Sequence, residues 1–418
     1  MMNNIRNFER TIQVISYKII VPKNNLIIIY GSSTNYNARN NNLKKIYFME
    51  ITAAIVGEKG SDFELGKVLL DEPGSEEVLV KIVATGICHT DLVARDFIMG
   101  SPNFPVILGH EGAGIIEKIG EDVHHLKVGD HVVLTYGYCG ECEICRSGTP
   151  AYCYEFFQRN FSGARVDGSH SHHDHDHKPI NDNFFSQSSF ATYSIAHKNN
   201  VIAVPKDAPL EILGPLGCGI QTGSGAIINT LKVKVGSSVV ISGTGAVGLS
   251  AVMAAKASSA TTIIAVDIND ERLEFSKELG ATHTINSLRE NVQERIREIL
   301  PNGVQYAVDT TGRNEVINNA LAVLAPVGEI AIIGVATKPL ELETNIFLTK
   351  GFKIKFVNQG DSVPQEFIPK LIKMYQHGQF PFDKLIKTYA FEDINQAVED
   401  SEKGRTIKSV LLIGDYKG

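Results

Sequence analysis

Four cysteines lie close together in the stretch CGECEICRSGTPAYC. Four thiolates at such spacing can complete the closed tetrahedral shell that zinc adopts in structural sites. A redox motif needs only two cysteines, and disulfides are rare in the reducing cytosol. We therefore predict that this segment binds a structural zinc, stabilises an irregular loop and takes no part in chemistry; the alternative is a group of free thiols. The predicted ligands are Cys139, Cys142, Cys145 and Cys153.

Two further cysteines and one histidine form a second candidate set: Cys88 in GICHTD, His110 in GHEGAG and Cys218 in GPLGCGIQTG. Taken singly, each is typical of an ordinary core residue. Together, two thiolates and one imidazole are the ligand set that leaves a fourth zinc position open for water or substrate. Spacing alone does not prove that the three converge. Asp91 and Glu111 adjoin the first two and are candidates for orienting them.

A third motif, GTGAVG, contains Gly243, Gly245 and Gly248. It follows the apolar run SVVIS and precedes an Ala-rich helical segment, the context in which such glycines let a pyrophosphate approach a helix N-terminus. Asp267 ends the next apolar run, where an acid accepts hydrogen bonds from the adenosine ribose and repels a 2′-phosphate. The motif therefore favours NAD over NADP. The alternative is a Gly-rich turn in an unrelated α/β domain.

The elements around these motifs change character along the chain. Residues 50–135 contain short β-type runs such as EEVLVKIVATG between Gly and Pro turns, which predicts an antiparallel, barrel-like domain. From about residue 235, apolar runs such as TTIIAVDIN and EIAIIGVA alternate with helical segments, as in a doubly wound parallel sheet. After about residue 358 polar helical segments return, and TIKSVLLIGD predicts a final strand.

Length and composition narrow the class of protein. A chain of 418 residues is expected to form two domains, and 43% hydrophobic with 21% charged residues is typical of a globular protein. The net charge of −7 argues against a nucleic-acid partner. No apolar run approaches the roughly 20 residues that span a bilayer. Six cysteines, four of them clustered, do not make a secreted disulfide scaffold, so we expect a cytoplasmic protein.

Two segments are unusual in composition. Residues 1–48 are rich in Asn and Lys or Arg, with Glu9 as the single acid. They are either a targeting presequence or, as we favour, a disordered extension or mis-assigned start upstream of Met49, because Asn replaces the Ser and Arg of transit peptides. The second segment, GSHSHHDHDHK at residues 168–178, invites a metal-binding interpretation. Its Gly, Ser and Asp residues favour instead an exposed, solvated loop.

The combination resembles the zinc-dependent medium-chain alcohol dehydrogenases over residues 49–418. GICHTD, GHEGAG, the four-cysteine segment, GCGIQTG, GTGAVG and GRTIKSVL occur in that family's order, and NFSGARVDG and FFSQSSFATY are most similar to its aryl-alcohol (benzyl-alcohol) branch. The resemblance implies an α/β protein with a GroES-like β-rich catalytic domain, made of residues 49–219 and 359–418, and a Rossmann doubly wound parallel-sheet domain at residues 220–358 that binds NAD.

The resemblance also implies roles for single residues. Cys88, His110 and Cys218 would bind a catalytic zinc, and the four clustered cysteines a structural zinc, two zinc ions per chain. Thr90 would receive the alcohol proton, with Asp91 and Glu111 completing the catalytic set. The implied cofactor contacts are His89 at the pyrophosphate, Thr222 beside the nicotinamide, Arg272 near the adenosine ribose and Lys408 at a phosphate, together with Gly243, Gly245, Gly248 and Asp267.

The implied reaction is reversible oxidation of a primary aromatic alcohol to its aldehyde, with hydride transfer to NAD and zinc favouring the alkoxide. Many members carry a His that finishes the proton relay three residues after the Thr, but this chain has Val93. The family suggests a homodimer or homotetramer. Alternatives within the class are a glutathione-dependent formaldehyde dehydrogenase and a broad aliphatic alcohol dehydrogenase. From a different class, the alternative is a non-catalytic dinucleotide- or metal-binding protein.

Overall fold

The structure is a computed structural model that describes residues 17–20, 28–31, 48–97, 103–336, 338–342 and 344–414. Strands β1 (Tyr17–Ile20) and β2 (Ile28–Gly31) pair antiparallel. The rest of residues 1–47, on which the predicted presequence or extension falls, lies outside the described residues. Among the described residues, no helix combines the length and apolarity needed to cross a membrane.

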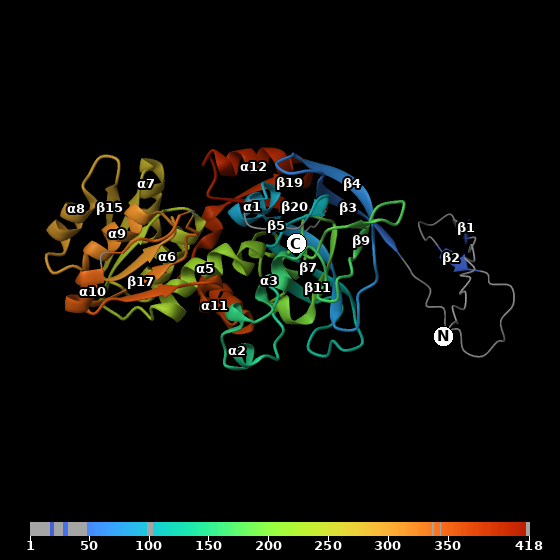
Figure 1. Ribbon diagram of the computed structural model, residues 1–418, viewed down its shortest axis with the longest axis horizontal. Helices are drawn as coiled ribbons and strands as arrows, with labels where there is room; N and C mark the ends of the chain where they lie inside the picture. Colours follow the sequence, from blue (N-terminus) through green and yellow to red (C-terminus); the bar gives the residue numbers. More distant parts are fainter. Residues whose placement is uncertain are drawn as a thin grey trace, which may run out of the picture.

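The β-rich lobe contains two largely antiparallel sheets, drawn in blue to green on the right of Figure 1. The five-stranded sheet has the order β10-β9-β4-β3-β6, and the larger sheet the order β12-β8-β7-β5-β20-β19, with β11 also paired to β5. Along some of these strands apolar side chains alternate with polar ones, and along others they follow one another directly. In both cases the apolar side chains face the core. The bounds are β3 (Met49–Val56), β4 (Phe63–Leu70), β5 (Glu77–Gly86), β6 (Val106–Ile107), β7 (Gly112–Ile119), β8 (His131–Leu134), β9 (His172–His173), β10 (Pro179–Ile180), β11 (Tyr193–His197), β12 (Val201–Val204), β19 (Ile386–Ala390) and β20 (Lys408–Leu412).

The second lobe is built on a six-stranded sheet in which every neighbouring pair is parallel. Its order, β15-β14-β13-β16-β17-β18, is that of a Rossmann fold, so the predicted fold class is confirmed. The buried apolar runs predicted as strands form its centre. The elements are β13 (Ser238–Ser242), α6 (Ala246–Ala257), β14 (Thr262–Asp267), α7 (Asp270–Leu279), β15 (His283–Asn286), α8 (Val292–Ile299), β16 (Val304–Asp309), α9 (Asn314–Ala322), β17 (Leu324–Ile332), α10 (Thr344–Lys350) and β18 (Lys353–Phe356).

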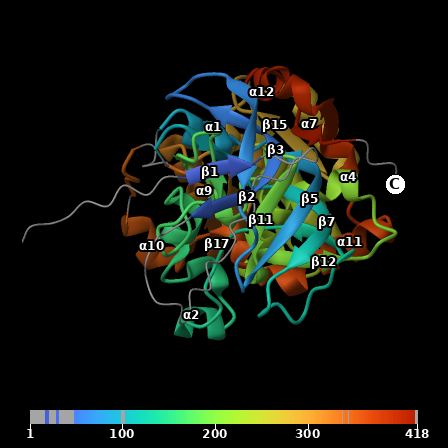
Figure 2. The same cartoon turned by 90° about the vertical axis from the view of Figure 1, so that its right-hand side faces the viewer.

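The two lobes share a core. The end of the chain returns to the β-rich lobe, where β20 pairs antiparallel with β5, after α11 (Pro364–Gln376) and α12 (Ile394–Glu402). One hydrophobic cluster contains Val83 and Ala113 of the β-rich lobe together with Val239 and Ile241 of the parallel sheet. Helix α5 (Gly219–Gly225) lies between the lobes; Figure 1 shows the antiparallel strands at the opposite end from α8 and α10, and Figure 2 shows β3, β5, β7 and β11 facing the viewer at that end.

The His-rich segment is not simply the exposed loop predicted from its composition. His172 lies in β9, is 1% exposed and donates from Nδ1 to the fully buried carboxylate of Asp182 at 2.8 Å. His173 pairs with Asp71 at 3.2 Å. The prediction was wrong for these two residues because a buried carboxylate and a neighbouring strand give them partners that the sequence does not reveal. The exposed residues of the segment are Gly168, Ser169, His175, Asp176 and Lys178.

Candidate active site

Cys88 is placed by the end of β5 and the start of α1 (His89–Arg95), for which it is the N-cap residue. Its backbone N–H donates to Asp91 Oδ2 at 2.9 Å. The turn before it requires glycine, because a Cβ on Gly86 would lie 2.0 Å from Glu111 Oε2. The thiol is thus held at the N-terminus of α1.

His110 lies between β6 and β7 and is fully buried. Its Nδ1 lies 2.7 Å from Asp91 Oδ1, which also accepts from the backbone N–H of Gly109 at 3.1 Å. Its Nε2 is buried and has no hydrogen-bond partner. An orphaned imidazole nitrogen whose ring is oriented by a carboxylate on the other side is the arrangement expected of a metal ligand.

Cys218 is the N-cap residue of α5 and is 7% exposed. The ligand atoms of Cys88, His110, Cys218 and Glu111 all lie within 4.8 Å of one another. The structure therefore brings the three predicted zinc ligands together from segments 130 positions apart (218 − 88), and adds Glu111 to them. Two thiols and an unpartnered imidazole fit a zinc ion with one position open.

Protons and a metal ion would compete for the thiols of Cys88 and Cys218 and the imidazole of His110. Burial opposes charge on His110, but the neighbouring Asp91 carboxylate and the Cys88 thiolate raise its pKa to about 10. A hydrogen bond from Cys218 lowers the pKa of Cys88 well below its ordinary value, against the effect of burial. Because zinc binds neutral imidazole and deprotonated thiols, metal binding would release the His110 proton.

Glu111 forms a buried ion pair with Lys408 beside this set. Lys408 Nζ donates to Glu111 Oε1 at 2.7 Å and to the carbonyl of Ile87 at 3.1 Å, and Lys408 is 4% exposed. Burial raises the pKa of Glu111 to about 7, although Lys408 opposes this. The phosphate contact expected of Lys408 remains a prediction, since its ammonium has protein partners in this structure. The ion pair fixes Lys408, which lines the cavity described next, against Glu111.

A cavity of about 520 Å³ opens between α1, α5 and α6. Five of the candidate site residues line it together with Val93: Cys88, His89, Gly245, Gly248 and Lys408. Thr90 Oγ1 lies 3.8 Å from Cys88 Sγ, close to the candidate zinc ligands. Thr222 lies on α5, is 8% exposed and donates its hydroxyl to the carbonyl of Cys218 at 2.7 Å. Thr90 and Thr222 therefore each lie beside a candidate zinc ligand, Cys88 and Cys218 respectively.

The glycine motif shapes the entrance to α6. A Cβ on Gly248 would lie 1.8 Å from the carbonyl oxygen of Gly243, whereas a Cβ on Gly245 would meet nothing within 4 Å. Gly243 has φ +90°, which favours glycine. The space left open at Gly245, at a helix N-terminus, fits the approach of a pyrophosphate.

A second cavity, of about 600 Å³, lies beyond the ends of β13 and β14 and is lined by Asp267, Arg272 and Arg313 among others. Asp267 Oδ2 accepts from the backbone N–H and the hydroxyl of Thr244, at 2.6 and 2.7 Å. Arg272 Nε is buried without a hydrogen-bond partner. An acid and an unpartnered guanidinium nitrogen at the carboxyl end of a parallel sheet fit an adenosine ribose and its neighbouring phosphate.

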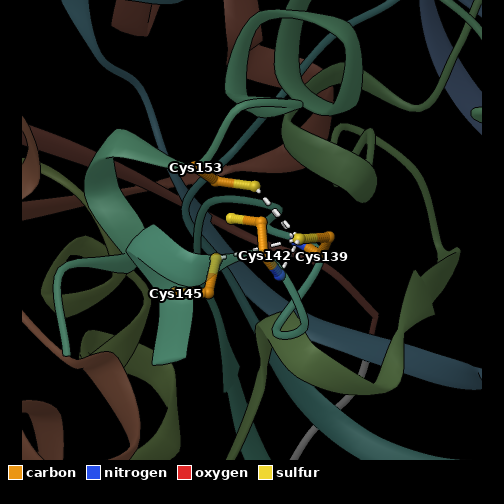
Figure 3. Close-up of side chains that lie close together, drawn as sticks. All are labelled: Cys139, Cys142, Cys145 and Cys153. Atoms are coloured by element: carbon orange, nitrogen blue, oxygen red, sulfur yellow. Dashed lines mark hydrogen bonds between the residues drawn. The ribbon is translucent and has the colours of Figure 1, made fainter. Parts of the chain in front are cut away.

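The four clustered cysteines point their sulfurs toward one another, as Figure 3 shows. All four ligand atoms lie within 4.8 Å, with Cys153 Sγ 3.5 Å and Cys145 Sγ 3.9 Å from Cys139 Sγ. These separations exclude disulfides, and tetrahedral coordination at about 2.3 Å sets sulfurs roughly 3.8 Å apart. Backbone N–H groups of Cys142 and Glu155 donate to the sulfurs of Cys139 and Cys153. The segment fits a closed zinc shell.

Sequence reasoning missed the residues that support His110. The ring of Phe185 stacks on the imidazole, with centroids 4.4 Å apart and 27° between planes. The Gln187 amide donates to the carbonyls of His110 and Thr135 at 3.0 and 3.1 Å. Phe185 has φ +52°, a conformation for which the run NFFSQSS gives no signal.

Comparison with known proteins agrees with this geometry. Residues 74–206 match the family described as alcohol dehydrogenase GroES-like domain, and residues 246–376 match the family described as zinc-binding dehydrogenase. The chain is 40% identical to geraniol dehydrogenase of Castellaniella defragrans, over 87% of this chain and 98% of that one. The chain therefore belongs to the zinc-binding medium-chain alcohol dehydrogenase family, as its motifs predicted.

Two solved structures are similar over nearly their whole length. An alcohol dehydrogenase zinc-binding domain protein from Burkholderia ambifaria is 48% identical, with a TM-score of 0.86 over 88% of this chain and all of that one. Benzyl alcohol dehydrogenase from Acinetobacter calcoaceticus is 51% identical, with a TM-score of 0.84 over 87% of this chain and 99% of that one.

Proposed function

We propose that the protein is an NAD- and zinc-dependent dehydrogenase that reversibly oxidises primary aromatic alcohols to aldehydes. The observation that carries the aromatic substrate is the group of rings beside His110. Phe185 stacks on the imidazole, Phe184 meets it edge-on at 5.5 Å, and Phe161 lies 5.1 Å from Phe185. We infer that these rings, packed beside a candidate zinc ligand, favour an aromatic substrate. The 51% identity to a benzyl alcohol dehydrogenase supports the same class.

The proposed roles follow from the contacts. Cys88, His110 and Cys218 would hold a zinc that polarises the alcohol oxygen, while bound NAD supplies the hydride acceptor. Asp91 holds the His110 ring through Nδ1, so that Nε2 faces the other ligands. Thr90, whose hydroxyl lies close to Cys88, accepts the alcohol proton and passes it outward.

The cofactor and metal complement are proposed as NAD and two zinc ions. The Asp267 carboxylate at the second cavity would accept the ribose hydroxyls and repel a 2′-phosphate, which supports NAD. The four-cysteine segment would hold the second zinc, in a shell with no position for substrate. A slower reaction with NADP than with NAD at equal concentration is the expected result.

A substrate panel tests the proposal. Initial rates of NADH formation are compared for benzyl alcohol, geraniol, and formaldehyde with glutathione, using zinc-loaded protein. We expect benzyl alcohol to be fastest. If geraniol exceeds benzyl alcohol by tenfold or more, the aromatic assignment is wrong and the geraniol dehydrogenase relative is the better guide. Fast reaction only with formaldehyde and glutathione would favour the glutathione-dependent alternative.

We also propose a cytoplasmic homo-oligomer. All six cysteines are free, which suits a reducing compartment. Strand β18 ends the parallel sheet, and Phe356 on it and Val327 on the neighbouring strand β17 are 66% and 72% exposed. Exposed apolar side chains at a sheet edge support pairing with a second copy. Light scattering after gel filtration should give a mass above that of the monomer. A monomer mass would contradict the proposed homo-oligomer.

A further inference from the structure

A short turn, η6 (Gln359–Asp361), lies against α5 and has an unusual backbone. Its three successive residues have φ +50°, +67° and +48°, and only Gly360 is a glycine. Consecutive left-handed residues are uncommon for side chains other than glycine, and they persist only where the surroundings hold them. Such a turn next to a candidate site raises the question of what it positions.

The turn is clamped from two sides. On one side, the hydroxyl of Tyr152, in the four-cysteine segment, lies 2.6 Å from Asp361 Oδ1. On the other, Thr230 donates its hydroxyl to Asp361 Oδ2 at 2.7 Å. Gly360 packs directly on α5, since a Cβ there would lie 2.3 Å from the carbonyl oxygen of Gln221. The left-handed backbone is thus held by contacts to both the four-cysteine segment and α5.

The clamped turn directs one side chain at a candidate zinc ligand. Gln359 is 8% exposed, and its Nε2 donates to Cys218 Sγ at 3.9 Å. Its Oε1 lies 3.5 Å from Nε2 of the fully buried Gln221, whose own Oε1 accepts from Ser362 at 2.8 Å. The amide nitrogen of Gln359 thus faces the sulfur, and its oxygen faces an amide nitrogen whose shorter hydrogen bonds go to Thr135 and to the carbonyl of Gly217.

We propose that Gln359 is a positioning residue of the active site, whose amide donates a hydrogen bond to the thiolate of Cys218 and whose turn is fixed by Tyr152 of the four-cysteine segment. This rests on the proposed role of Cys218 as a zinc ligand. A hydrogen bond stabilises the thiolate and lowers the energy of its lone pairs, so it sets both the orientation of the ligand and the charge that it gives to the metal.

The test uses Gln359→Met, which keeps the length of the side chain and removes the donor. Cobalt(II) is placed in the catalytic site of the full chain, and the sulfur-to-cobalt charge-transfer band is recorded. Cys88→Ser protein, which lacks one candidate ligand of the catalytic site, is treated identically. Its spectrum gives the contribution of the four-cysteine segment to the charge-transfer band. We expect the band to move to lower energy, because the lone pairs of the unbonded thiolate lie higher, and the affinity for the metal to fall about tenfold.

The matched control is Gln365→Met on α11, whose amide donates to the carbonyl of Asn199 at 2.6 Å; its spectrum should equal that of the wild type. Gln359→Asn, which tolerates the left-handed backbone but is shorter, should reproduce the shift if Gln359→Met folds poorly. Tyr152→Phe should give a smaller shift in the same direction.

Two failures are distinguishable. If the wild type binds cobalt through Cys218 and neither Gln359 variant changes the band or the affinity, the inference is overturned and the proposed function stands. If the wild type shows no thiolate-to-cobalt band beyond that of Cys88→Ser, the zinc site itself is refuted, and this inference with it.

Discussion

A single buried carboxylate holds two of the candidate zinc ligands. Asp91 Oδ1 lies 2.7 Å from His110 Nδ1, and Asp91 Oδ2 accepts the backbone N–H of Cys88 at 2.9 Å. Asp91 is fully buried. The same side chain therefore orients the imidazole and fixes the start of α1, so the two ligands move as a unit.

Removing this carboxylate should weaken the metal site. Asp91→Ala leaves His110 Nδ1 and the N–H of Cys88 without their acceptor, and we expect zinc affinity to fall between tenfold and a hundredfold. Asp91→Asn, which keeps an acceptor oxygen, should lose less. Zinc release is measured by competition with a chromogenic chelator. Asp182→Asn, which alters a different buried carboxylate–histidine pair, should leave zinc affinity unchanged.

The two cysteine sets should differ in what their loss affects. We expect about two zinc ions per wild-type chain and one in either Cys88→Ser or Cys142→Ser. Cys88→Ser should abolish turnover with little change in Tm, whereas Cys142→Ser should lower Tm because the segment loses its cross-link. Elemental analysis and calorimetry on protein first stripped of ions from the His-rich hairpin would check this. Equal effects on turnover and Tm would contradict the division of roles.

Val93 lines the cavity that contains Cys88 and His89, at the position where the family resemblance led us to expect a histidine. We expect Val93→His to add an ionisation near pH 6.5 to the pH dependence of kcat, because imidazole titrates in that range. Val128→His, at an exposed surface position, is the control. An unchanged profile would show that the proton does not leave past residue 93.

Two glycines of the same motif should respond differently to alanine. Gly248→Ala places a Cβ 1.8 Å from a backbone oxygen, so we expect a loss of about 2 kcal/mol of stability as well as of NAD binding. Gly245→Ala meets no atom within 4 Å and should fold normally, but it should raise the Kd for NAD about tenfold by occupying the phosphate path. Calorimetry and fluorescence titration separate the two. Normal NAD binding by Gly245→Ala would show that the pyrophosphate does not bind at Gly245.

Asp182 should make the free energy of unfolding vary with pH in the acid range. Burial raises its pKa, but hydrogen bonds from His170 and His172 outweigh this and lower the pKa below its ordinary value. The stabilisation is therefore present above the unfolded pKa of about 4 and lost as pH falls through the lower folded value. Asp182→Asn should cost about 2 kcal/mol at pH 6, and its deficit should shrink below pH 4. Urea unfolding measures this; a deficit that does not change with pH would exclude the ion pair.

Residue type and spacing predicted the two clusters of candidate ligands and the Rossmann sheet, because thiol chemistry and continuous apolar strands leave direct marks in a sequence. The residues that position the candidate ligands left no such mark in the sequence. Phe185 and Gln359 act through left-handed backbone that neither residue type favours, and their contacts reach residues 75 (185 − 110) and 141 (359 − 218) positions away. Lys408 was expected at a phosphate, yet burial beside Glu111 gives it a protein partner that only the tertiary structure reveals. His172 was missed for the same reason.

The most direct measurement is kcat/KM for benzyl alcohol and for ethanol, followed as NADH formation by the zinc-loaded protein. The aromatic rings beside His110 predict a preference for benzyl alcohol of about a hundredfold, or roughly 2.7 kcal/mol of differential transition-state binding. Equal kcat/KM values would contradict the aromatic assignment. No turnover of either alcohol, with both cysteine sets loaded and NAD bound, would contradict the proposed activity itself.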